Sequence, residues 1–420
     1  MANGYQSPFD IKETSLGGKG DFTVRKSLET VEEYAVENVA ADIIVNANES
    51  NYPMPQEVAD SILARTASFP FNRYPPIKSE NLAEAIAAEL EVDTDCVKIG
   101  NGSSQLLEIA CYAFGGAGRR IAVPYPSFSM YSEYAALSDS EAVYYPLTDE
   151  GFVDPDAVIR FCREQQPSLL IVCNPNNPTG NYNRLPDMER IIANVDCPVI
   201  MDEAYMEFAG GKDLPPNDMR PLNKIWLVAG SALSLLGRYG NFMVLRTFSK
   251  AYGLAGMRCG YAVGGLGLMR QLGKAILPYT VNAYTLMVAK TVYENKLLYK
   301  ERIKAICAQR DYFAAYVKKL GFRVWPAAGN FVTFRAEGSL AAQLAEAYDK
   351  KYGNKLAELD QREACGKLIF RELLDSGILV QDFTGHPMLK GCLRITIGMP
   401  EENKLILAKL TEIVVASTEQ

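Results

Sequence analysis

Five short apolar runs, each followed directly by a cluster of polar, glycine or proline residues, constrain the fold of this chain most. The runs occupy residues 96–99, 121–123, 168–173, 198–201 and 242–248. Helical patterns lie between them, and alternating strands and helices are typical of a mostly parallel sheet with helices on both faces. Ligands of such sheets bind at the carboxyl ends of the strands. We therefore expect an α/β fold in which the five polar clusters form one site.

The cluster after the last run contains a lysine with the features of a covalent catalyst. Lys250 follows Ser249, and Arg258 lies eight residues further along. Desolvation and nearby positive charge lower the pKa of a lysine at the end of a buried strand. The resulting free amine is the nucleophile that forms an imine with an aldehyde. Ser249 and Arg258 can donate hydrogen bonds to a phosphate. An aldehyde and a phosphate are together the reactive and anchoring groups of pyridoxal phosphate.

Composition narrows the possible chemistry and the possible partners. The 420 residues include a single histidine, His386. This count argues against a catalytic triad or a metal site that is built from histidine. Nine cysteines without a Cys-x-x-Cys pair indicate reduced thiols in core positions. A net charge of −7 without a basic block argues against nucleic acid as a partner. We find neither an apolar run of membrane-spanning length nor a signal pattern, so we expect no membrane partner and a cytoplasmic location.

The length of the chain favours two domains. We expect an N-terminal arm over residues 1–45, a large domain over 46–286 and a smaller α+β domain over 287–420. The small domain is indicated by a long helical pattern over residues 287–320, which is followed by several short strand patterns and a final helix.

Seven motifs, in family order along the chain, resemble those of fold-type-I pyridoxal-phosphate aminotransferases, most closely the histidinol-phosphate aminotransferase family. The motifs are Asn46-Ala47-Asn48-Glu49, Arg73-Tyr74-Pro75, Gly100-Asn101-Gly102-Ser103, Asn176-Asn177-Pro178-Thr179-Gly180, Asp202-Glu203-Ala204-Tyr205, the stretch Thr247 to Arg258, and Gly391-Cys392-Leu393-Arg394-Ile395-Thr396. The resemblance extends from about Asn46 to the C-terminus. It implies an aspartate-aminotransferase-like fold and pyridoxal 5′-phosphate as the cofactor.

The resemblance also implies roles for residues around the cofactor ring. Lys250 would attach the cofactor and move a proton between the substrate Cα and the cofactor C4′. Asp202 would pair with the pyridine nitrogen and keep the ring cationic. Asn177 and Tyr205 would donate hydrogen bonds to the 3′-oxygen of the ring, and Phe128 would stack on the ring face.

A second set of residues would hold the cofactor phosphate in such a protein. This set comprises Ser103, Ser104, Ser249, Arg258 and Tyr74, with Thr247 as a weaker candidate. The two serines at 103 and 104 open a predicted helix, and the N–H groups at a helix N-terminus favour anions. In the family, the equivalent of Tyr74 reaches over from the second subunit, which implies a homodimer.

Arg394 would hold the anionic end of the substrate, and Tyr34 of the arm would line the same pocket. Two departures from the family pattern bear on this pocket. Where the family often carries a second anion-binding arginine, just before Asp382, this chain has Gln381. Losing a charge-assisted contact to a phosphate typically costs about 1.5–3 kcal/mol. An insertion at residues 210–240 could cover the site, extend a dimer contact or do neither.

Three functions remain open at this point. The first is amino transfer from histidinol phosphate to 2-oxoglutarate, a step of histidine biosynthesis, which gives imidazole acetol phosphate and glutamate. The second keeps the cofactor but changes the chemistry, as in an aromatic amino-acid aminotransferase or a threonine-phosphate-type decarboxylase. The third is a non-catalytic, effector-binding protein with an aminotransferase fold. The intact Lys250 and the lack of an appended DNA-binding segment argue against the third.

Overall fold

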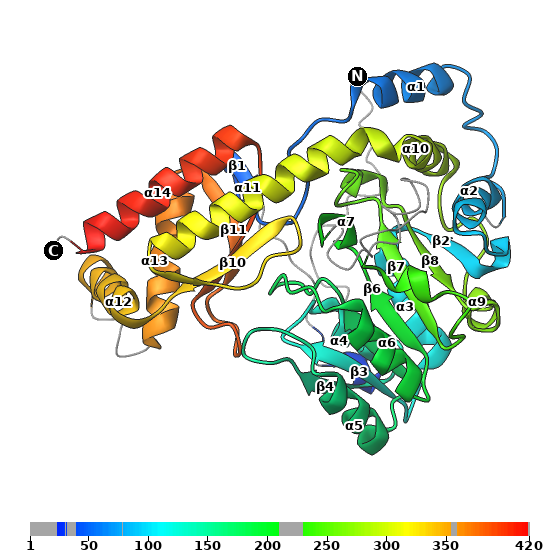
Figure 1. Ribbon diagram of the computed structural model, residues 1–420, viewed down its shortest axis with the longest axis horizontal. Helices are drawn as coiled ribbons and strands as arrows, with labels where there is room; N and C mark the ends of the chain where they lie inside the picture. Colours follow the sequence, from blue (N-terminus) through cyan, green and yellow to red (C-terminus); the bar gives the residue numbers. More distant parts are fainter. Residues whose placement is uncertain are drawn as a thin grey trace, which may run out of the picture.

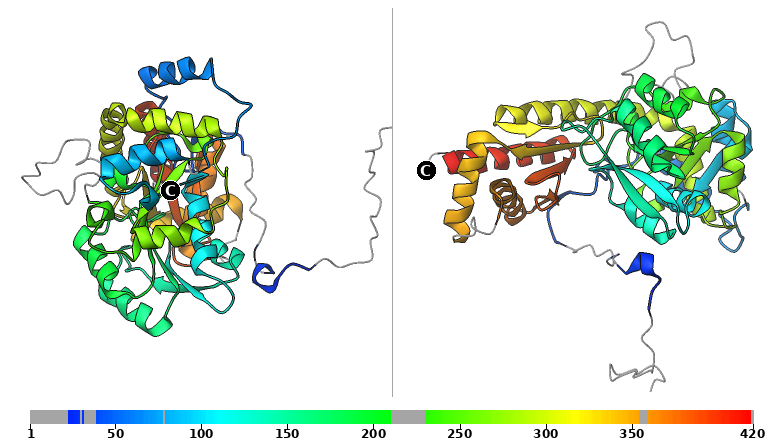
Figure 2. Two further views of the ribbon diagram at one scale, coloured as in Figure 1. Left: turned by 90° about the vertical axis from the view of Figure 1, so that its right-hand side faces the viewer. Right: turned by 90° about the horizontal axis from the view of Figure 1, so that it is seen from below.

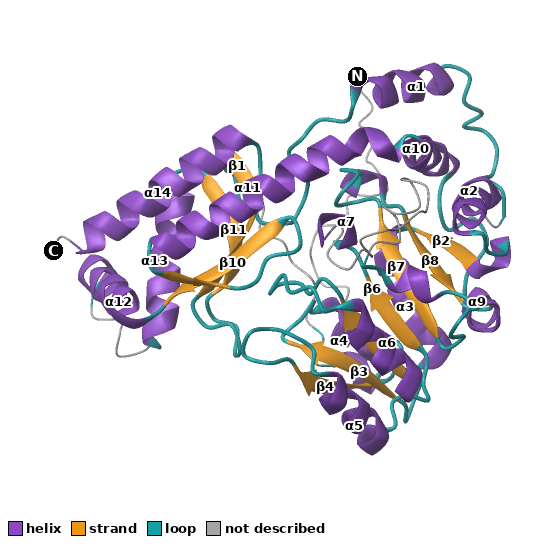
Figure 3. Ribbon diagram, viewed as in Figure 1, coloured by secondary structure: helices purple, strands orange, loops and turns teal. Residues whose placement is uncertain are grey.

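Two β-sheets organise the protein (Figures 1 and 3). The computed structural model describes residues 23–29, 31, 39–77, 79–209, 230–353 and 359–418. Within these ranges one sheet has seven strands and the other has five. Figure 2 shows the two sheets with their helices as two lobes of the molecule, linked by the long helix that runs between them.

The larger sheet has the strand order β2-β8-β7-β6-β5-β3-β4. Its strands are β2 (Val97–Gly100), β3 (Arg120–Tyr125), β4 (Glu141–Pro146), β5 (Leu169–Cys173), β6 (Val199–Asp202), β7 (Phe242–Thr247) and β8 (Gly260–Gly264). β8 runs antiparallel to both of its neighbours, and the other described pairings in the sheet are parallel. Every residue of the interior strand β5 is buried, as expected for a parallel sheet covered on both faces. The expected mostly parallel sheet is therefore confirmed.

Helices cover the larger sheet on both faces. They are α2 (Glu80–Leu90), α3 (Gly102–Phe114), α4 (Met130–Leu137), α5 (Pro155–Gln165), α6 (Leu185–Asn194), α7 (Met206–Ala209), α9 (Leu266–Gly273) and α10 (Ala283–Glu294), while α1 (Gln56–Thr66) packs on α10. Successive residues of each strand point to opposite faces of the sheet, so the sheet separates two clusters of buried side chains. The helices α3, α4 and α9 pack against one face, and α2, α5, α6 and α10 belong to the cluster on the other face. Short 3-10 helices occupy Lys26–Leu28, Thr94–Cys96, Ala232–Leu235, Ala255–Met257 and Lys296–Tyr299.

The smaller sheet has the order β1-β11-β12-β10-β9. Its strands are β1 (Ile43–Val45), β9 (Phe322–Val324), β10 (Phe331–Ala336), β11 (Ile378–Phe383) and β12 (Cys392–Thr396). The helices α11 (Lys300–Lys319), α12 (Gly338–Tyr352), α13 (Gln361–Asp375) and α14 (Pro400–Thr418) accompany it. α11 begins near the larger lobe and extends along the smaller one (Figure 1).

Three local features differ from the expected pattern. The helical region over 287–320 is interrupted at Asn295, the C-cap of α10, whose side-chain Nδ2 donates to the Thr291 carbonyl at 2.8 Å. The expected domain boundary at residue 286 therefore falls inside α10, which packs against α1 and α2. β1, at the end of the expected arm, pairs in parallel with β11 of the smaller sheet. The three residues of β1 follow the arm in sequence, but they form an edge strand of the smaller sheet, whose other strands lie far along the chain.

The nine cysteines have no disulfide partner, and eight of them are buried, as the sequence indicated. None of the helices described is long and apolar enough to cross a membrane.

Candidate active site

Strand register gathers the polar clusters at one edge of the larger sheet. Gly100 of β2 pairs with Gly260 of β8, and Gly260 pairs with Thr247 of β7. Asp202 of β6 pairs with Leu245 of β7 on one side and with β5 on the other. The chain segments that follow β2, β5, β6 and β7 therefore leave the sheet at neighbouring positions. The expected convergence of these strand ends is confirmed.

The N-terminus of α3 and a guanidinium group form a tight, positively polarised corner. Gly102, at the first position of α3, has a φ of +80°, and a Cβ there would lie 2.7 Å from Nη2 of Arg258. A Cβ on Gly260 would lie 2.3 Å from the amide nitrogen of Ser103. Both glycines thus permit a close approach that any side chain would block. The corner offers helix N-terminal N–H groups and an arginine, which fits a phosphate.

The hydroxyl groups expected near this corner lie in the same neighbourhood. Ser249 is buried, and its amide donates to Oγ1 of Thr247 at 3.1 Å. Ser104 makes a side-chain hydrogen bond with Tyr134, and this bond lowers the tyrosine pKa although burial raises it overall. The sequence did not indicate Tyr134, which joins α4 to the start of α3.

Lys250 is positioned by the loop that follows β1. Its Nζ donates a hydrogen bond to the Ala47 carbonyl at 2.8 Å. Burial, followed by the positive charges of Arg394 and Arg258, lowers the pKa of Lys250 to about 8, while Glu49 opposes the shift. The lowered pKa expected from the sequence is present. A free amine is therefore available near neutral pH, as nucleophilic attack on an aldehyde requires.

Asp202 is a buried carboxylate held on both oxygens. Its Oδ2 accepts a hydrogen bond from the Tyr131 hydroxyl at 2.8 Å, and its Oδ1 accepts one from the Ala204 amide at 3.2 Å. Burial raises the pKa of Asp202 despite these two hydrogen bonds. Asp202 has no ion pair with any residue that the structure describes, so a cationic ring nitrogen would relieve the cost of its charge. The site thus fits a pyridinium group.

Tyr131 was not anticipated from the sequence, although it lies only three residues after Phe128. The ring of Phe128 meets the ring of Tyr131 edge-on, with centroids 5.5 Å apart. Phe128 therefore contacts Tyr131, the residue that donates a hydrogen bond to Asp202. This position is compatible with the expected stacking of Phe128 on a cofactor ring that is bound at Asp202. Phe128 lies two residues before α4 and Tyr131 lies in its first turn, where the Tyr131 amide donates to the Phe128 carbonyl at 3.2 Å. The spacing of three residues at this helix start was the signal that the sequence contained.

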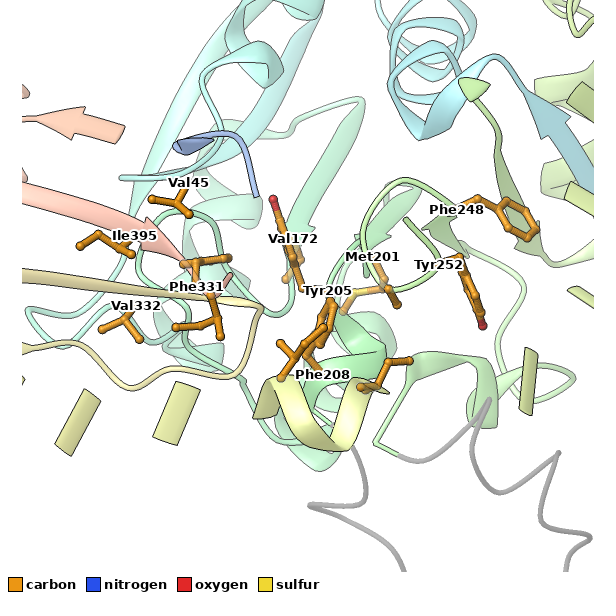
Figure 4. Close-up of a cluster of buried hydrophobic side chains, with 14 of the residues drawn as sticks. Val45, Val172, Met201, Tyr205, Phe208, Phe248, Tyr252, Phe331, Val332 and Ile395 are labelled. Atoms are coloured by element: carbon orange, nitrogen blue, oxygen red, sulfur yellow. The ribbon is translucent and has the colours of Figure 1, made fainter. Parts of the chain in front are cut away.

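Asn48 connects the loop after β1 to the site and to the smaller sheet. Its Nδ2 donates to the Tyr205 hydroxyl at 3.0 Å, and its amide donates to Oγ1 of Thr396 at 2.9 Å. Burial raises the pKa of Tyr205 to about 12, so the phenol remains a hydrogen-bond donor at neutral pH. Figure 4 shows Tyr205 beside Phe331 of β10, and their ring centroids lie 5.2 Å apart. The contacts of Asn48 reach residues more than 150 positions away, which local sequence patterns do not reveal.

Arg394, which we expected to hold the substrate, joins the two lobes. It is 6% exposed, and its Nη1 and Nη2 donate to Asn177 Oδ1 and to the Asn46 carbonyl, both at 2.5 Å. Gln381 is its direct cross-strand partner in β11, and side chains opposite each other in an antiparallel pair share one face. The position where a second arginine was expected therefore adjoins Arg394, and a neutral amide occupies it.

Tyr74 lies apart from this group of residues in the same chain. It is 82% exposed on the segment between α1 and α2, where its ring stacks on Tyr279 with centroids 4.8 Å apart. Phe71 on the same segment is 70% exposed. Tyr34, which we expected in the substrate pocket, lies outside the described residues.

The described end of the insertion packs behind Asp202. Residues 210–229 lie outside the described part of the chain, but Ser231 and Ala232 donate hydrogen bonds to the Glu203 carboxylate at 2.5 and 2.8 Å. Arg246 forms buried ion pairs with Glu203 and Glu207, each at 2.9 Å. Residues 231 and 232 therefore brace the residue that follows Asp202 in sequence.

Comparisons with known proteins agree with this geometry. Residues 42–410 match the model of the family described as aminotransferase class I and II. A histidinol-phosphate aminotransferase of Chlorobaculum tepidum is 31% identical over 92% of this chain and 99% of the relative.

Two solved structures share the fold at lower identity. The histidinol-phosphate aminotransferase from Sinorhizobium meliloti, in complex with pyridoxal 5′-phosphate, superposes with a TM-score of 0.75 at 21% identity over 95% of this chain and 99% of that one. The L-threonine-O-3-phosphate decarboxylase from Porphyromonas gingivalis gives a TM-score of 0.67 at 20% identity, over 89% and 99% of the two chains. The expected aspartate-aminotransferase-like fold is confirmed.

Proposed function

The chain belongs to the class I and II aminotransferases and is a pyridoxal-phosphate-dependent transaminase, and from this premise we propose that it moves the amino group of histidinol phosphate to 2-oxoglutarate. The products would be imidazole acetol phosphate and glutamate. The observation that carries the proposal is Arg394, a buried guanidinium that lowers the pKa of Lys250 and so lies close to the reacting amine. The relatives named histidinol-phosphate aminotransferase support the same substrate.

We propose that the residues at the ends of β2 and β7 anchor the cofactor phosphate. The N-terminal N–H groups of α3 and the Arg258 guanidinium would supply donors, with the hydroxyls of Ser103, Ser104 and Ser249. Anchoring at this corner leaves the aldehyde end free to point toward Lys250. The support is the close approach of Arg258 to Gly102, at 2.7 Å from the Cβ position.

Bound pyridoxal phosphate supplies a carbonyl carbon for covalent attachment and a ring that accepts the electron pair left when the substrate loses its Cα proton. Lys250 would hold the cofactor through that carbonyl and, when its amine is free, would carry a proton between the substrate Cα and the cofactor C4′. Its pKa of about 8 lets it act as base and as acid near neutral pH.

Asp202 would keep a proton on the ring nitrogen, and Tyr131 fixes the orientation of the Asp202 carboxylate through the 2.8 Å hydrogen bond. Asn177 and Tyr205 would donate to the 3′-oxygen of the ring, and Phe128 would pack on the ring face. Tyr205 is suited to donation because its pKa of about 12 keeps the phenol protonated.

Gln381 favours a second candidate, an aromatic amino-acid aminotransferase. A phosphate dianion is held better by two guanidinium groups than by one guanidinium and an amide. A carboxylate carries one charge and fits Arg394 alone. The fold shared with a threonine-phosphate decarboxylase keeps that reaction as a third outcome of the test.

The test compares kcat/KM of the holoenzyme for histidinol phosphate, phenylalanine, tyrosine and threonine phosphate, with 2-oxoglutarate as acceptor. Histidinol phosphate should give the highest value. A tenfold or greater preference for phenylalanine or tyrosine would replace it with the aromatic candidate. Release of CO2 from threonine phosphate would indicate decarboxylation.

We further propose that the active unit is a homodimer in which Tyr74 of each protomer reaches the phosphate corner of its partner. The exposed, proline-flanked segment that carries Phe71 and Tyr74 supports this arrangement. A Tyr74→Phe variant should bind the cofactor several-fold more weakly. Elution of the fully active enzyme as a monomer from a sizing column would refute the dimer.

A further inference from the structure

A separate cavity of about 340 Å³ lies between the two lobes. Its larger-lobe wall includes Thr148, Asp149 and Thr179, and its smaller-lobe wall includes three arginines, Arg323, Arg335 and Arg362, with Trp325. Lys250, Asp202 and Arg394 do not line it. Three guanidinium groups in one interdomain cavity have no part in the amino-transfer chemistry described above.

Two of these arginines are held in fixed positions. Arg323 and Arg335 are direct cross-strand partners in β9 and β10, and their guanidinium carbons lie 4.5 and 5.2 Å from the centre of the Trp325 ring. The Arg335 side chain is 9% exposed. Like charges placed opposite each other in a sheet repel, so this pair requires anions to balance it.

One carboxylate balances the pair only in part. Glu337 Oε1 accepts from Arg335 Nη2 at 2.6 Å and from Arg323 Nη1 at 3.4 Å. Burial alone would raise the pKa of Glu337, but hydrogen bonds from Arg335 and Arg323 lower it, so the group stays ionised. The Arg362 guanidinium makes no ion pair with the described residues. With Asp149 counted, three positive charges face two negative ones.

The larger-lobe wall offers hydroxyl groups that are ready to donate. Thr148 Oγ1 accepts a hydrogen bond from the Phe152 amide at 3.0 Å, and Thr179 Oγ1 accepts one from Asn176 Nδ2 at 2.8 Å. Because each oxygen already accepts, its own hydrogen can be directed to a ligand.

The cavity is distinct from the substrate pocket. Thr333 is the cross-strand partner of Arg394, and Arg335 lies two residues further along β10, about 7 Å away on the same face. Between them the Thr333 hydroxyl donates to the Pro178 carbonyl at 2.5 Å and closes one lobe against the other. A substrate whose amine reaches Lys250 would use Arg394 and leave this cavity open.

We propose that this cavity is a second anion site, which takes a phosphate group and ties the two lobes together. The guanidinium groups of the smaller lobe and the threonine hydroxyls of the larger lobe would donate to the same phosphate oxygens. Phosphate has enough acceptors for all of them and carries the negative charge that the arginines lack. The site would be filled by free phosphate or by the phosphate of a small ester.

Isothermal titration of the holoenzyme tests the proposal, because the bound cofactor already fills the phosphate corner at α3. Inorganic phosphate and glycerol 3-phosphate are titrated separately, so that the two sources are distinguished. Wild type should bind at least one of them at millimolar concentration or below. An Arg323→Gln/Arg362→Gln double variant should bind about tenfold more weakly or not at all.

A Glu337→Gln variant distinguishes an arginine cluster that binds a ligand from one that only stabilises the fold through its ion pairs with Glu337. Removing the competing carboxylate should tighten phosphate binding, whereas a purely structural ion pair would only lose stability. Arg270→Gln, an exposed arginine on α9, is the matched control and should bind phosphate as wild type does. The proposal is overturned if wild type binds neither ligand at 10 mM, about the weakest affinity useful for a specific site. It is also overturned if the double variant binds as wild type does.

Discussion

The proposed cofactor side and the proposed substrate side of the active site differ in how their charges are supplied. On the cofactor side, Arg258 and the α3 N-terminus form one corner, and Asp202 is held on both oxygens by Tyr131 and Ala204. On the substrate side, a single buried arginine, Arg394, adjoins a neutral amide at position 381. The proposed cofactor side therefore offers a cationic corner for a phosphate and a carboxylate for a ring nitrogen, and the proposed substrate side offers fewer charges than a phosphate dianion favours.

The two sides also differ in how they are built. The cofactor side consists of neighbouring strand ends of one sheet, whose relative positions are fixed by register. On the substrate side, Arg394 of the smaller sheet contacts Asn46 and Asn177 from distant parts of the chain. Changes on the cofactor side should therefore affect the chemical step, and changes on the substrate side should affect recognition and the fit between the lobes.

Replacing Lys250 should cause the largest loss. Lys250→Ala removes both the covalent anchor and the proton carrier, so kcat should fall by about 10⁴-fold or more. Wild-type holoenzyme should be yellow, and borohydride should fix the cofactor to Lys250, as peptide mass spectrometry would detect. Fixation at another lysine, or a colourless protein that takes up no cofactor, would contradict the assignment.

Asp202 should be next in importance. In Asp202→Ala the ring nitrogen loses its carboxylate, and kcat should fall by about 10²–10⁴-fold while the cofactor stays bound through its phosphate. Asp202→Glu keeps the charge and should retain more activity than Ala. Tyr131→Phe should cause a smaller loss than Asp202→Ala, because it removes only the support of one oxygen. Wild-type turnover by Asp202→Ala would remove Asp202 from the mechanism.

The sequence predicted the strands whose ends meet near Lys250 because the signals of these strands are local. The strand that ends at Asp202 and the apolar run before Lys250 are contiguous patterns, and the alternation of strand and helix patterns along the chain favours a parallel sheet. The contacts of Asn48 with Tyr205 and Thr396 were not predictable, because they join segments that only the fold brings together. β1 was missed for the same reason, since three apolar residues at the end of a polar stretch do not identify a partner strand.

Arg394→Ala should weaken recognition more than chemistry. Charge-assisted hydrogen bonds to a bound anion are each worth about 1.5–3 kcal/mol, so KM should rise by roughly 10–150-fold for either class of substrate. The absorbance of the bound cofactor should remain that of wild type. Release of the cofactor would instead place Arg394 on the cofactor side and remove the distinction drawn above.

The lowered pKa of Lys250 predicts how the stability of the cofactor-free protein depends on pH. The folded pKa of about 8 lies below the ordinary value of 10.5, so between these values the unfolded chain binds more protons and stability rises with pH. Below pH 8 the buried ammonium costs up to about 3 kcal/mol. Lys250→Met lacks this cost. Denaturant unfolding should therefore show the variant more stable at pH 7, with a smaller difference at pH 9.5. A difference that does not change with pH would contradict the buried ammonium.

Gln381→Arg should give the smallest effect and the most direct test of the substrate side. A second guanidinium opposite Arg394 would add one charge-assisted contact to a phosphate, and about 1.5 kcal/mol corresponds to roughly a tenfold gain in kcat/KM for histidinol phosphate. Phenylalanine presents a single carboxylate, which Arg394 already holds, so its kcat/KM should change by less than about threefold. The matched control is Gln381→Met, which keeps the size of the side chain and adds no charge. If Gln381→Arg improves phenylalanine as much as histidinol phosphate, the residue does not contact the phosphate, and the deficit of charge beside Arg394 has no bearing on substrate choice.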